Sequence, residues 1–283
     1  MTSVFSTSSL FLNRTELGAA LGRADAPCVL DVRRSERFSQ SSHGVPTARH
    51  VPPDHLLAFI QQHRPRAAIV YCVHGHELSQ GAVQQLRAAG WDARYLAGGI
   101  DGGEPGVDDA AQVAAWRAEP LPLMKLRPDL GVGATASSRW ITREHPKIDR
   151  VACPWLIRCF IDRDAQFFYA PAAEVLARAE TEHAVAFDLP GAPISHEADH
   201  CSFDALLCAF DLNLPGLDRL TRSVRGADTN RPDLAPAAAG LLAVSVGMAR
   251  LHADDDHAMM PFYDDLGAWC LDQASGSTET HSR

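Results

Sequence analysis

The sequence predicts an α/β fold in which an N-terminal parallel sheet with flanking helices is followed by an α/β domain that ends in a helical bundle. Three observations predict it. In the first half, short apolar runs of β type alternate with segments of helical spacing, which is typical of a parallel sheet with helices on both faces. Toward the end of the chain, consecutive helical segments replace this alternation. The charge also changes, because residues 1–139 carry 14 basic and 13 acidic side chains and residues 140–283 carry 12 and 22.

The first half is expected to contain three strands and four helices. Thr15 can cap the first helix, over residues 16–21. The other elements follow as a strand at 28–32, a helix at 54–62, a strand at 69–71, a helix at 79–88 that ends at Gly90, a strand at 93–96 closed by Gly98 and Gly99, and a short helix at 108–117. Residues 120–138 contain several prolines and glycines and show no sustained period, so they are predicted to be a linker.

In the second half, strands are expected at 140–142, 166–169 and 185–188. Helices are expected at 148–160, where Pro154 disturbs the pattern, at 172–181, at 203–210 after a Ser202 cap, and at 214–225, 237–251 and 258–271. We therefore predict a first domain at residues 1–119, a linker at 120–138, a second domain at 139–273 and a frayed tail at 274–283.

Composition limits the function classes. With 283 residues, 46% hydrophobic and 22% charged, the chain is typical of a soluble protein with two domains. It has no apolar stretch of transmembrane length and no recognisable secretory signal, so we expect a cytoplasmic protein without a membrane partner. The net charge of −9 makes nucleic-acid binding unlikely without excluding it. Seven cysteines without tight pairing are expected to be reduced thiols. The oligomeric state does not follow from the sequence.

Cys72 is the best candidate for a reactive residue. An apolar run of β type ends at this thiol, and a turn and a helix of residues 79–88 follow it. A thiol placed where backbone N–H groups converge at the start of a helix is stabilised as the nucleophilic thiolate. The alternative is a buried structural cysteine, but the loop context favours the reactive interpretation. The predicted active-site loop consists of Val73, His74, Gly75, His76 and Glu77.

Residues from about 10 to 117 resemble a rhodanese domain. The resemblance is carried by Val29-Leu30-Asp31-Val32-Arg33, by Val45-Pro46-Thr47-Ala48-Arg49-His50-Val51-Pro52, by Tyr71-Cys72 and by Leu96-Ala97-Gly98-Gly99-Ile100. It implies that Cys72 carries sulfane sulfur as a persulfide and that a small sulfur donor is a partner.

Two departures from the rhodanese pattern bear on this activity. The usual family loop has an arginine where this chain has Glu77, and the order His43-Gly44-Val45-Pro46 replaces Gly-His-Ile-Pro. A carboxylate beside the thiol opposes its ionisation and repels thiosulfate, which is a dianion. A persulfide relay, a thiol sensor and a degenerate scaffold therefore remain as interpretations, and His74 or His76 can partly replace the arginine.

Basic residues in the acidic second half predict an oxyanion site. Lys147, Arg150 and Arg158 fall on one face of the expected helix, and Arg143 lies just before it. Such a fork of donors at a helix start can hold a tetrahedral oxyanion. The alternative is that these cations pair on the surface with the carboxylates of Asp149, Asp162 and Asp164.

The segment His196-Glu197-Ala198-Asp199-His200 matches the H-E-x-x-H pattern of zinc proteases. That chemistry needs both histidines on one helix face, whereas prolines before the segment and the Ser202 cap after it predict a loop. A metal or oxyanion site without protease chemistry fits better, and a divalent metal ion is the only cofactor considered. Its ligands would be His196, Glu197 and His200, with Asp228, Cys201 or Asp264 from elsewhere. Alternatively, Glu197 and Asp199 only favour the start of the next helix.

Residues 139–272 resemble the chromate-resistance domain of ChrB-type proteins. The resemblance is carried by Trp140-Ile141-Thr142-Arg143, the run from Pro146 to Arg158, Cys201-Ser202-Phe203-Asp204, Val224-Arg225-Gly226-Ala227-Asp228 and Tyr263-Asp264. It implies a bacterial protein of chromate resistance with chromate as an oxyanion partner, and it adds Arg225 to the predicted anion-binding set. A regulator of a chromate-efflux operon is an alternative, against which no helix-turn-helix or basic recognition helix is recognisable. A metal-dependent hydrolase or reductase that uses the His196–His200 loop is another.

Overall fold

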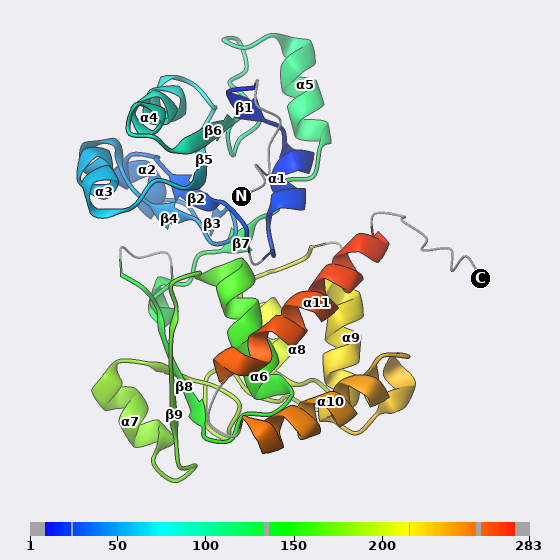
Figure 1. Ribbon diagram of the computed structural model, residues 1–283. Coiled ribbons are helices and arrows are strands. Elements are labelled where there is room, and N and C mark those ends of the chain that lie inside the picture. Colours follow the sequence, from blue (N-terminus) through cyan, green and yellow to red (C-terminus); the bar gives the residue numbers. More distant parts are fainter. Residues whose placement is uncertain (1–8, 24, 133–135, 215, 253–255, 275–283) are drawn as a thin grey trace. The chain divides into compact units, whose positions relative to one another are not determined.

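A computed structural model describes residues 9–23, 25–132, 136–214, 216–252 and 256–274 (Figure 1). The described chain forms two compact units. The first contains residues 9–21 and 25–128, and the second contains most of the chain from residue 136 onward. The mixed α/β class expected from the sequence is confirmed.

The first unit is built on a five-stranded parallel sheet with the order β1-β6-β5-β2-β4. Its strands are β1 (Phe11–Leu12), β2 (Cys28–Asp31), β4 (Arg49–His50), β5 (Ala67–Tyr71) and β6 (Asp92–Leu96). Two further short strands, β3 (His43–Gly44) and β7 (Met124–Lys125), pair with each other in antiparallel orientation. Because the five strands are parallel, their carboxyl ends share one edge of the sheet, and the loops that follow them lie at that edge.

Helices cover both faces of this sheet (Figure 1). They are α1 (Arg14–Ala20), α2 (Ser35–Ser39), α3 (Leu56–Gln62), α4 (Glu77–Ala88) and α5 (Ala110–Ala118), with a 3-10 turn at Pro53–His55. Alternate residues of β2 and β5 pack with α3 and α4 in one apolar cluster, whereas α1 and α5 lie on the opposite side of the sheet. The β-α alternation expected for the first half is therefore present.

The ends of these helices differ from the sequence-based expectations. The first helix is capped by Asn13 and not by Thr15, because Asn13 and Glu16 form a reciprocal capping box. Helix α4 begins at Glu77, two residues before the expected start, since residues of the loop itself complete its first turn. The short elements β1, β3, β4, β7 and α2 were not expected, because segments of two to five residues carry too little periodicity to be recognised.

A buried ionic network joins the ends of the two central strands. The Asp31 carboxylate, which is 1% exposed, accepts hydrogen bonds from Arg33 Nε at 2.9 Å, from Arg33 Nη2 at 2.6 Å and from the Tyr71 hydroxyl at 2.8 Å. The Tyr71 hydroxyl also accepts the backbone N–H of Val45. Burial raises the pKa of Tyr71, so the phenol remains a proton donor to Asp31. The network fixes the end of β5, immediately before Cys72.

The second unit has a three-stranded parallel sheet with the order β10-β8-β9. Its strands are β8 (Arg139–Arg143), β9 (Gln166–Ala170) and β10 (Val185–Ala186), and helix α7 (Val175–Glu182) packs with Ile141, Ala170 and Ala186 through Val175. The buried Trp140 lies near the rings of Phe187 and Phe210.

The remaining helices of this unit are α6 (Asp149–Leu156), α8 (Ser202–Ala209), α9 (Leu217–Asp228), α10 (Ala238–Leu251) and α11 (Asp256–Ala274), with a 3-10 turn at Pro232–Leu234. Helix α6 starts only at Asp149 and continues into a π-helical segment, Ile157–Ile161. Pro154 lies inside α6 and cannot donate a backbone hydrogen bond, which is consistent with this irregular end. The cap of α8 is Cys201 and not Ser202, whose backbone N–H donates to Asp149.

The proline- and glycine-rich segment predicted as a linker contains regular structure. Strand β7 lies within it and pairs with β3 of the first unit, and a 3-10 turn follows at Pro128–Leu130. The chain passes from the first compact unit to the second between residues 128 and 136, inside this segment. The predicted tail from residue 275 onward lies outside the described residues. All seven cysteines are free thiols. No helix in the described part of the chain has the length and hydropathy needed to span a membrane.

The Asp31 network yields a stability prediction. Asp31→Ala should lower the free energy of unfolding by about 3–5 kcal/mol, because it leaves the Arg33 guanidinium buried without its partner. Chemical denaturation followed by circular dichroism measures this change. Asp101→Ala is the control in the same unit, since it removes only a half-exposed pair with Arg37 at 3.9 Å and should cost less than about 1 kcal/mol. Equal losses in the two variants would contradict a structural role for the network.

Candidate functional site

Cys72 lies at the carboxyl end of β5, and the loop after it is interlocked with a second glycine loop. Gly75 has a φ of 80°, and a Cβ at this position would lie 2.8 Å from the backbone nitrogens of Gly98 and Gly99. A Cβ on Gly99 would lie 2.5 Å from the Val73 carbonyl oxygen. Only glycine permits this approach of two backbones, so the glycines hold the cysteine loop against the residues that follow β6.

The hydrogen bonds of this loop leave its N–H groups available to a ligand. The carbonyls of Cys72 and Val73 accept the N–H groups of Ile100 and Asp101 at 3.1 and 2.9 Å. Within the described residues, the backbone N–H groups from Val73 to Glu77 donate no hydrogen bond. These donors precede or open α4, where the helix dipole also favours negative charge. The loop can therefore bind an anion or a sulfur that carries negative charge.

The thiol itself is recessed. Cys72 is 4% exposed and belongs to the apolar cluster between the sheet and helices α3 and α4. Its Sγ donates a hydrogen bond to Ser79 Oγ at 3.3 Å, and the Ser79 hydroxyl donates to the His76 carbonyl at 3.1 Å. The sulfur thus lies at the inner end of the loop, next to a hydroxyl group on the first turn of α4.

The two histidines of the loop point to another segment of the same unit. His74 Nδ1 donates to the Gly103 carbonyl at 3.2 Å, and His76 Nε2 lies 2.9 Å from Asp108 Oδ2. The backbone N–H of Glu104 and the His76 imidazole lower the pKa of Asp108. Glu77 is exposed. The histidines therefore hold the segment 103–108 in place, and nothing in this geometry gives them the role of the missing arginine.

The five cations predicted to bind an oxyanion do not form one fork. Arg225 pairs with Asp204, Arg158 stacks on the ring of Phe167, and Lys147 is exposed and precedes α6. The expected helical face fails because α6 begins only at Asp149 and Arg158 lies in the π-helical segment.

Only Arg143 and Arg150 stay together. Arg143 donates a hydrogen bond to Oδ2 of Asp188 at 2.9 Å, and Arg150 Nε forms an ion pair with the same oxygen at 3.2 Å. Their partner is a carboxylate of the β10 region, so the alternative pairing with Asp149, Asp162 or Asp164 is not seen for these two arginines.

The H-E-x-x-H segment forms a tight turn and not a helix, in agreement with the loop predicted from the sequence. Glu197 and His200 exchange two backbone hydrogen bonds, and Ala198 between them has a φ of 52°. The side chains of Glu197 and His200 are exposed and contribute nothing to the cluster around His196.

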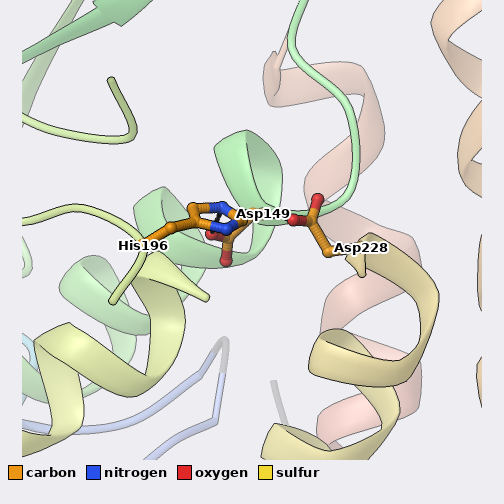
Figure 2. A group of neighbouring side chains, drawn as sticks. All are labelled: Asp149, His196 and Asp228. Atoms are coloured by element: carbon orange, nitrogen blue, oxygen red, sulfur yellow. Dashed lines mark ion pairs between the residues drawn. The ribbon is translucent and has the colours of Figure 1, made fainter. Parts of the chain in front are cut away.

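Two residues of the predicted metal set do come together, with a third that the sequence analysis missed. Figure 2 shows the His196 imidazole directed toward Asp149 and Asp228. One potential ligand atom from each of these residues lies within 4.8 Å of the others. The further candidates Cys201 and Asp264 are not members of this group: Cys201 Sγ donates to Asp204, and Asp264 accepts the Trp155 indole N–H.

Asp149 is the centre of this cluster. It is 1% exposed, and its two oxygens accept the backbone N–H groups of Ser202 and Phe203 at 2.7 and 3.0 Å. The Cys153 thiol also donates to it at 3.5 Å. Ile148, the preceding residue, has a φ of 37°, a strained conformation for a β-branched side chain. The sequence analysis considered Asp149 only as a surface partner of basic residues, although the sequence places it between Lys147 and Arg150.

Comparison with known proteins identifies both halves of the chain. The rhodanese-like domain family matches residues 13–104, and the family of the ChrB C-terminal domain matches residues 140–270.

The chain joins a rhodanese-like domain to a ChrB C-terminal domain.

The resemblance to both families is thereby confirmed. Protein ChrB of Cupriavidus metallidurans is 38% identical over 130 residues, which are 46% of this chain and 37% of that protein. The match thus spans little more than a third of the relative's length. Among solved structures, a rhodanese-related protein of Thermoplasma volcanium is 22% identical with a TM-score of 0.30, covering 41% of this chain and 97% of its own. A rhodanese homolog of Thermus thermophilus is 29% identical with a TM-score of 0.27, covering 32% and 98%.

The carboxylates of the ChrB C-terminal domain strongly polarise His196. Its Nε2 lies 3.4 Å from Asp149 Oδ2, 3.1 Å from Asp188 Oδ1 and 3.3 Å from Asp228 Oδ2. A hydrogen bond to Asp149 and the charges of the three carboxylates raise the pKa of His196 to about 9. Burial and the nearby Asp149 raise the pKa of Asp228 to about 6. In the absence of another cation, the imidazolium neutralises only part of the negative charge of this cluster.

This electrostatic arrangement predicts a pH dependence. His196 has a raised pKa in the folded state, so its contribution to stability is complete below 6.5, the ordinary pKa, and is lost as the pH rises through about 9. Between these values, in the presence of a chelator, the free energy of unfolding of the wild type should fall more than that of His196→Gln. Denaturant titrations at several pH values measure this, with His200→Gln as a control that should follow the wild type. Parallel curves for wild type and His196→Gln would contradict the assignment.

Proposed function

We propose that the rhodanese-like domain carries sulfur as a persulfide on Cys72 and that it does so as part of a ChrB-type chromate-resistance protein. The observation that carries this proposal is the loop of residues 73–77, whose backbone N–H groups have no acceptor within the described chain. An anionic sulfur bound to Cys72 would supply that acceptor. The free N–H donors and the start of α4 can together hold the negative charge of a persulfide sulfur at this position.

The reaction proceeds in two balanced steps. The Cys72 thiolate attacks the outer sulfur of a donor, a sulfur–sulfur bond forms, and the donor leaves as its thiolate or equivalent anion. An acceptor nucleophile then attacks the outer sulfur of the persulfide, and Cys72 leaves as the thiolate. No net oxidation of the protein occurs. The Ser79 hydroxyl oxygen lies 3.3 Å from Sγ, and its proton can turn from the His76 carbonyl to the sulfur when the sulfur is ionised.

The charge around the loop argues for a donor other than thiosulfate. Glu77 is exposed on the first turn of α4, and Glu104 and Asp108 flank the His76 imidazole. A dianion approaching Cys72 is repelled by these carboxylates. The recessed thiol also requires a slender donor, because Cys72 is 4% exposed. A persulfide or another small donor with less negative charge than thiosulfate meets both conditions.

Sulfur transfer has better geometric support than the oxyanion role predicted for the ChrB C-terminal domain. Of the five predicted cations, only Arg143 and Arg150 converge, and both are already paired with Asp188. An oxyanion at this position must compete with that carboxylate. The cysteine loop, by contrast, offers donors that nothing else in the described chain occupies.

Intact-protein and peptide mass spectrometry test the proposal. After incubation with a low-molecular-weight persulfide donor, the peptide that contains Cys72 should gain one sulfur atom, and Cys72→Ser should abolish this gain. Cys208→Ser is the matched control, because Cys208 is the exposed cysteine among the described residues and would react first if exposure alone decided. A gain of sulfur at Cys208 without one at Cys72 would refute the proposal.

Exchange of the loop carboxylate tests donor selection. Glu77→Arg should raise the rate of sulfur transfer from thiosulfate by about tenfold or more, because it replaces a repulsive charge with an attractive one on the loop that follows Cys72. Cyanide-dependent thiocyanate formation measures the rate. Asp92→Arg makes the same change of charge at the start of β6, on the opposite edge of the parallel sheet, and should leave the rate nearly unchanged. Equal acceleration by both variants would indicate only an effect of net charge.

A further inference from the structure

The cluster around His196 contains more acceptors than one imidazole can satisfy. A single Nε2 lies within 3.1–3.4 Å of three carboxylate oxygens, from Asp149, Asp188 and Asp228. A ring nitrogen carries one proton, which serves one acceptor well. A divalent cation can instead interact with several donors at once. The imidazole of His196 and the carboxylates of Asp149 and Asp228 have the composition of a cation site, with one ligand atom of each within 4.8 Å of the others (Figure 2).

The position of Asp228 adds an independent argument. Asp228 is the last residue of α9, so its carboxylate lies at the negative end of the helix dipole, where an anion is destabilised. Its side chain is 18% exposed and faces the buried carboxylate of Asp149. Among the described residues, the only ion pair of Asp228 is with His196. The backbone N–H of Asp149 and the charges of His196 and Arg150 offset part of this cost, and a cation bound beside the carboxylate would offset more of it.

Asp149 is preorganised for such a role. The backbone N–H groups of Ser202 and Phe203 fix its two oxygens, and its side chain is almost completely buried. Asp188 differs, because Arg143, Arg150 and Ser202 already occupy its oxygens. Two arginines therefore already compensate the charge of Asp188. Neither Asp149 nor Asp228 forms an ion pair with a lysine or arginine among the residues that the structure describes, although the charge of Arg150 acts on both.

We propose that Asp149, His196 and Asp228 form a divalent-cation site in the ChrB C-terminal domain. This site is independent of the proposed sulfur chemistry at Cys72. One imidazole nitrogen with carboxylate oxygens suits Zn²⁺, Mn²⁺ or Fe²⁺, whereas Ca²⁺ and Mg²⁺ prefer oxygen ligands alone. His196 is 39% exposed, so solvent reaches the remaining coordination positions. Three protein ligands with open positions are typical of sites at which a metal binds a further small ligand.

Isothermal titration calorimetry of the full chain tests this site, after treatment with a chelator and with Zn²⁺ and Mn²⁺ as separate probes. The wild type should bind one ion per chain. His196→Ala and Asp228→Asn should weaken binding by at least about tenfold, because each removes a proposed ligand. His200→Ala is the matched control, since His200 is exposed in the same turn and lies outside the cluster, and it should bind as the wild type does.

Mn²⁺ separates this site from adventitious binding to thiols, because thiolate ligands select softer metals. Circular dichroism should show that the His196 and Asp228 variants remain folded. Asp149 is not substituted in this test, because its loss would also remove an anchor of α8. The proposal is overturned if the wild type binds neither ion. It is also overturned if His200→Ala loses binding while His196→Ala and Asp228→Asn retain it, since the ligands would then be those of the linear H-E-x-x-H segment.

Discussion

The buried carboxylate of Asp149 is the interaction on which the ChrB C-terminal domain depends. A carboxylate that is 1% exposed is tolerated only when hydrogen bonds and opposite charge compensate for the loss of water. Its partners come from α8 and from the turn at His196. Compensation of one charge thus holds α8 and this turn against α6. The same imidazole lies 3.3 Å from Asp228 at the end of α9, which brings the candidate cation ligands together.

The rhodanese-like domain applies the same principle at its own site. Asp31 is equally buried, and Arg33 and Tyr71 satisfy its oxygens at the carboxyl edge of the sheet. Because Tyr71 directly precedes Cys72, the network determines where the reactive loop leaves β5. The interlocked glycines at 75 and 99 then complete the loop and leave its N–H groups without acceptors. In both domains, a buried aspartate holds the backbone from which the functional groups project.

The sequence predicted features that are local and missed those that depend on distant partners. The main strands, most of the longer helices and the position of Cys72 at a strand end follow from periodicity and turn residues near each position. Asp149 was missed because Ser202, His196 and Asp228 lie more than 40 residues away along the chain, and no local pattern connects them to it. The predicted fork of cations failed for a related reason, since Ile148 and Pro154 change the start and course of α6.

The H-E-x-x-H segment shows why proximity in sequence misled the prediction of the ligand set. His196 and His200 are close along the chain, yet a tight turn with a positive φ at Ala198 directs only His196 into the cluster. The pairing of Phe187 with Ile194 brings the turn alongside Asp188, whose Oδ1 lies 3.1 Å from His196 Nε2. Strand pairing and a buried charge, and not the spacing of the motif, therefore select which histidine joins the cluster. The two domains consequently offer opposite electrostatic environments, with backbone N–H donors around the proposed persulfide in one and carboxylates around the proposed cation in the other.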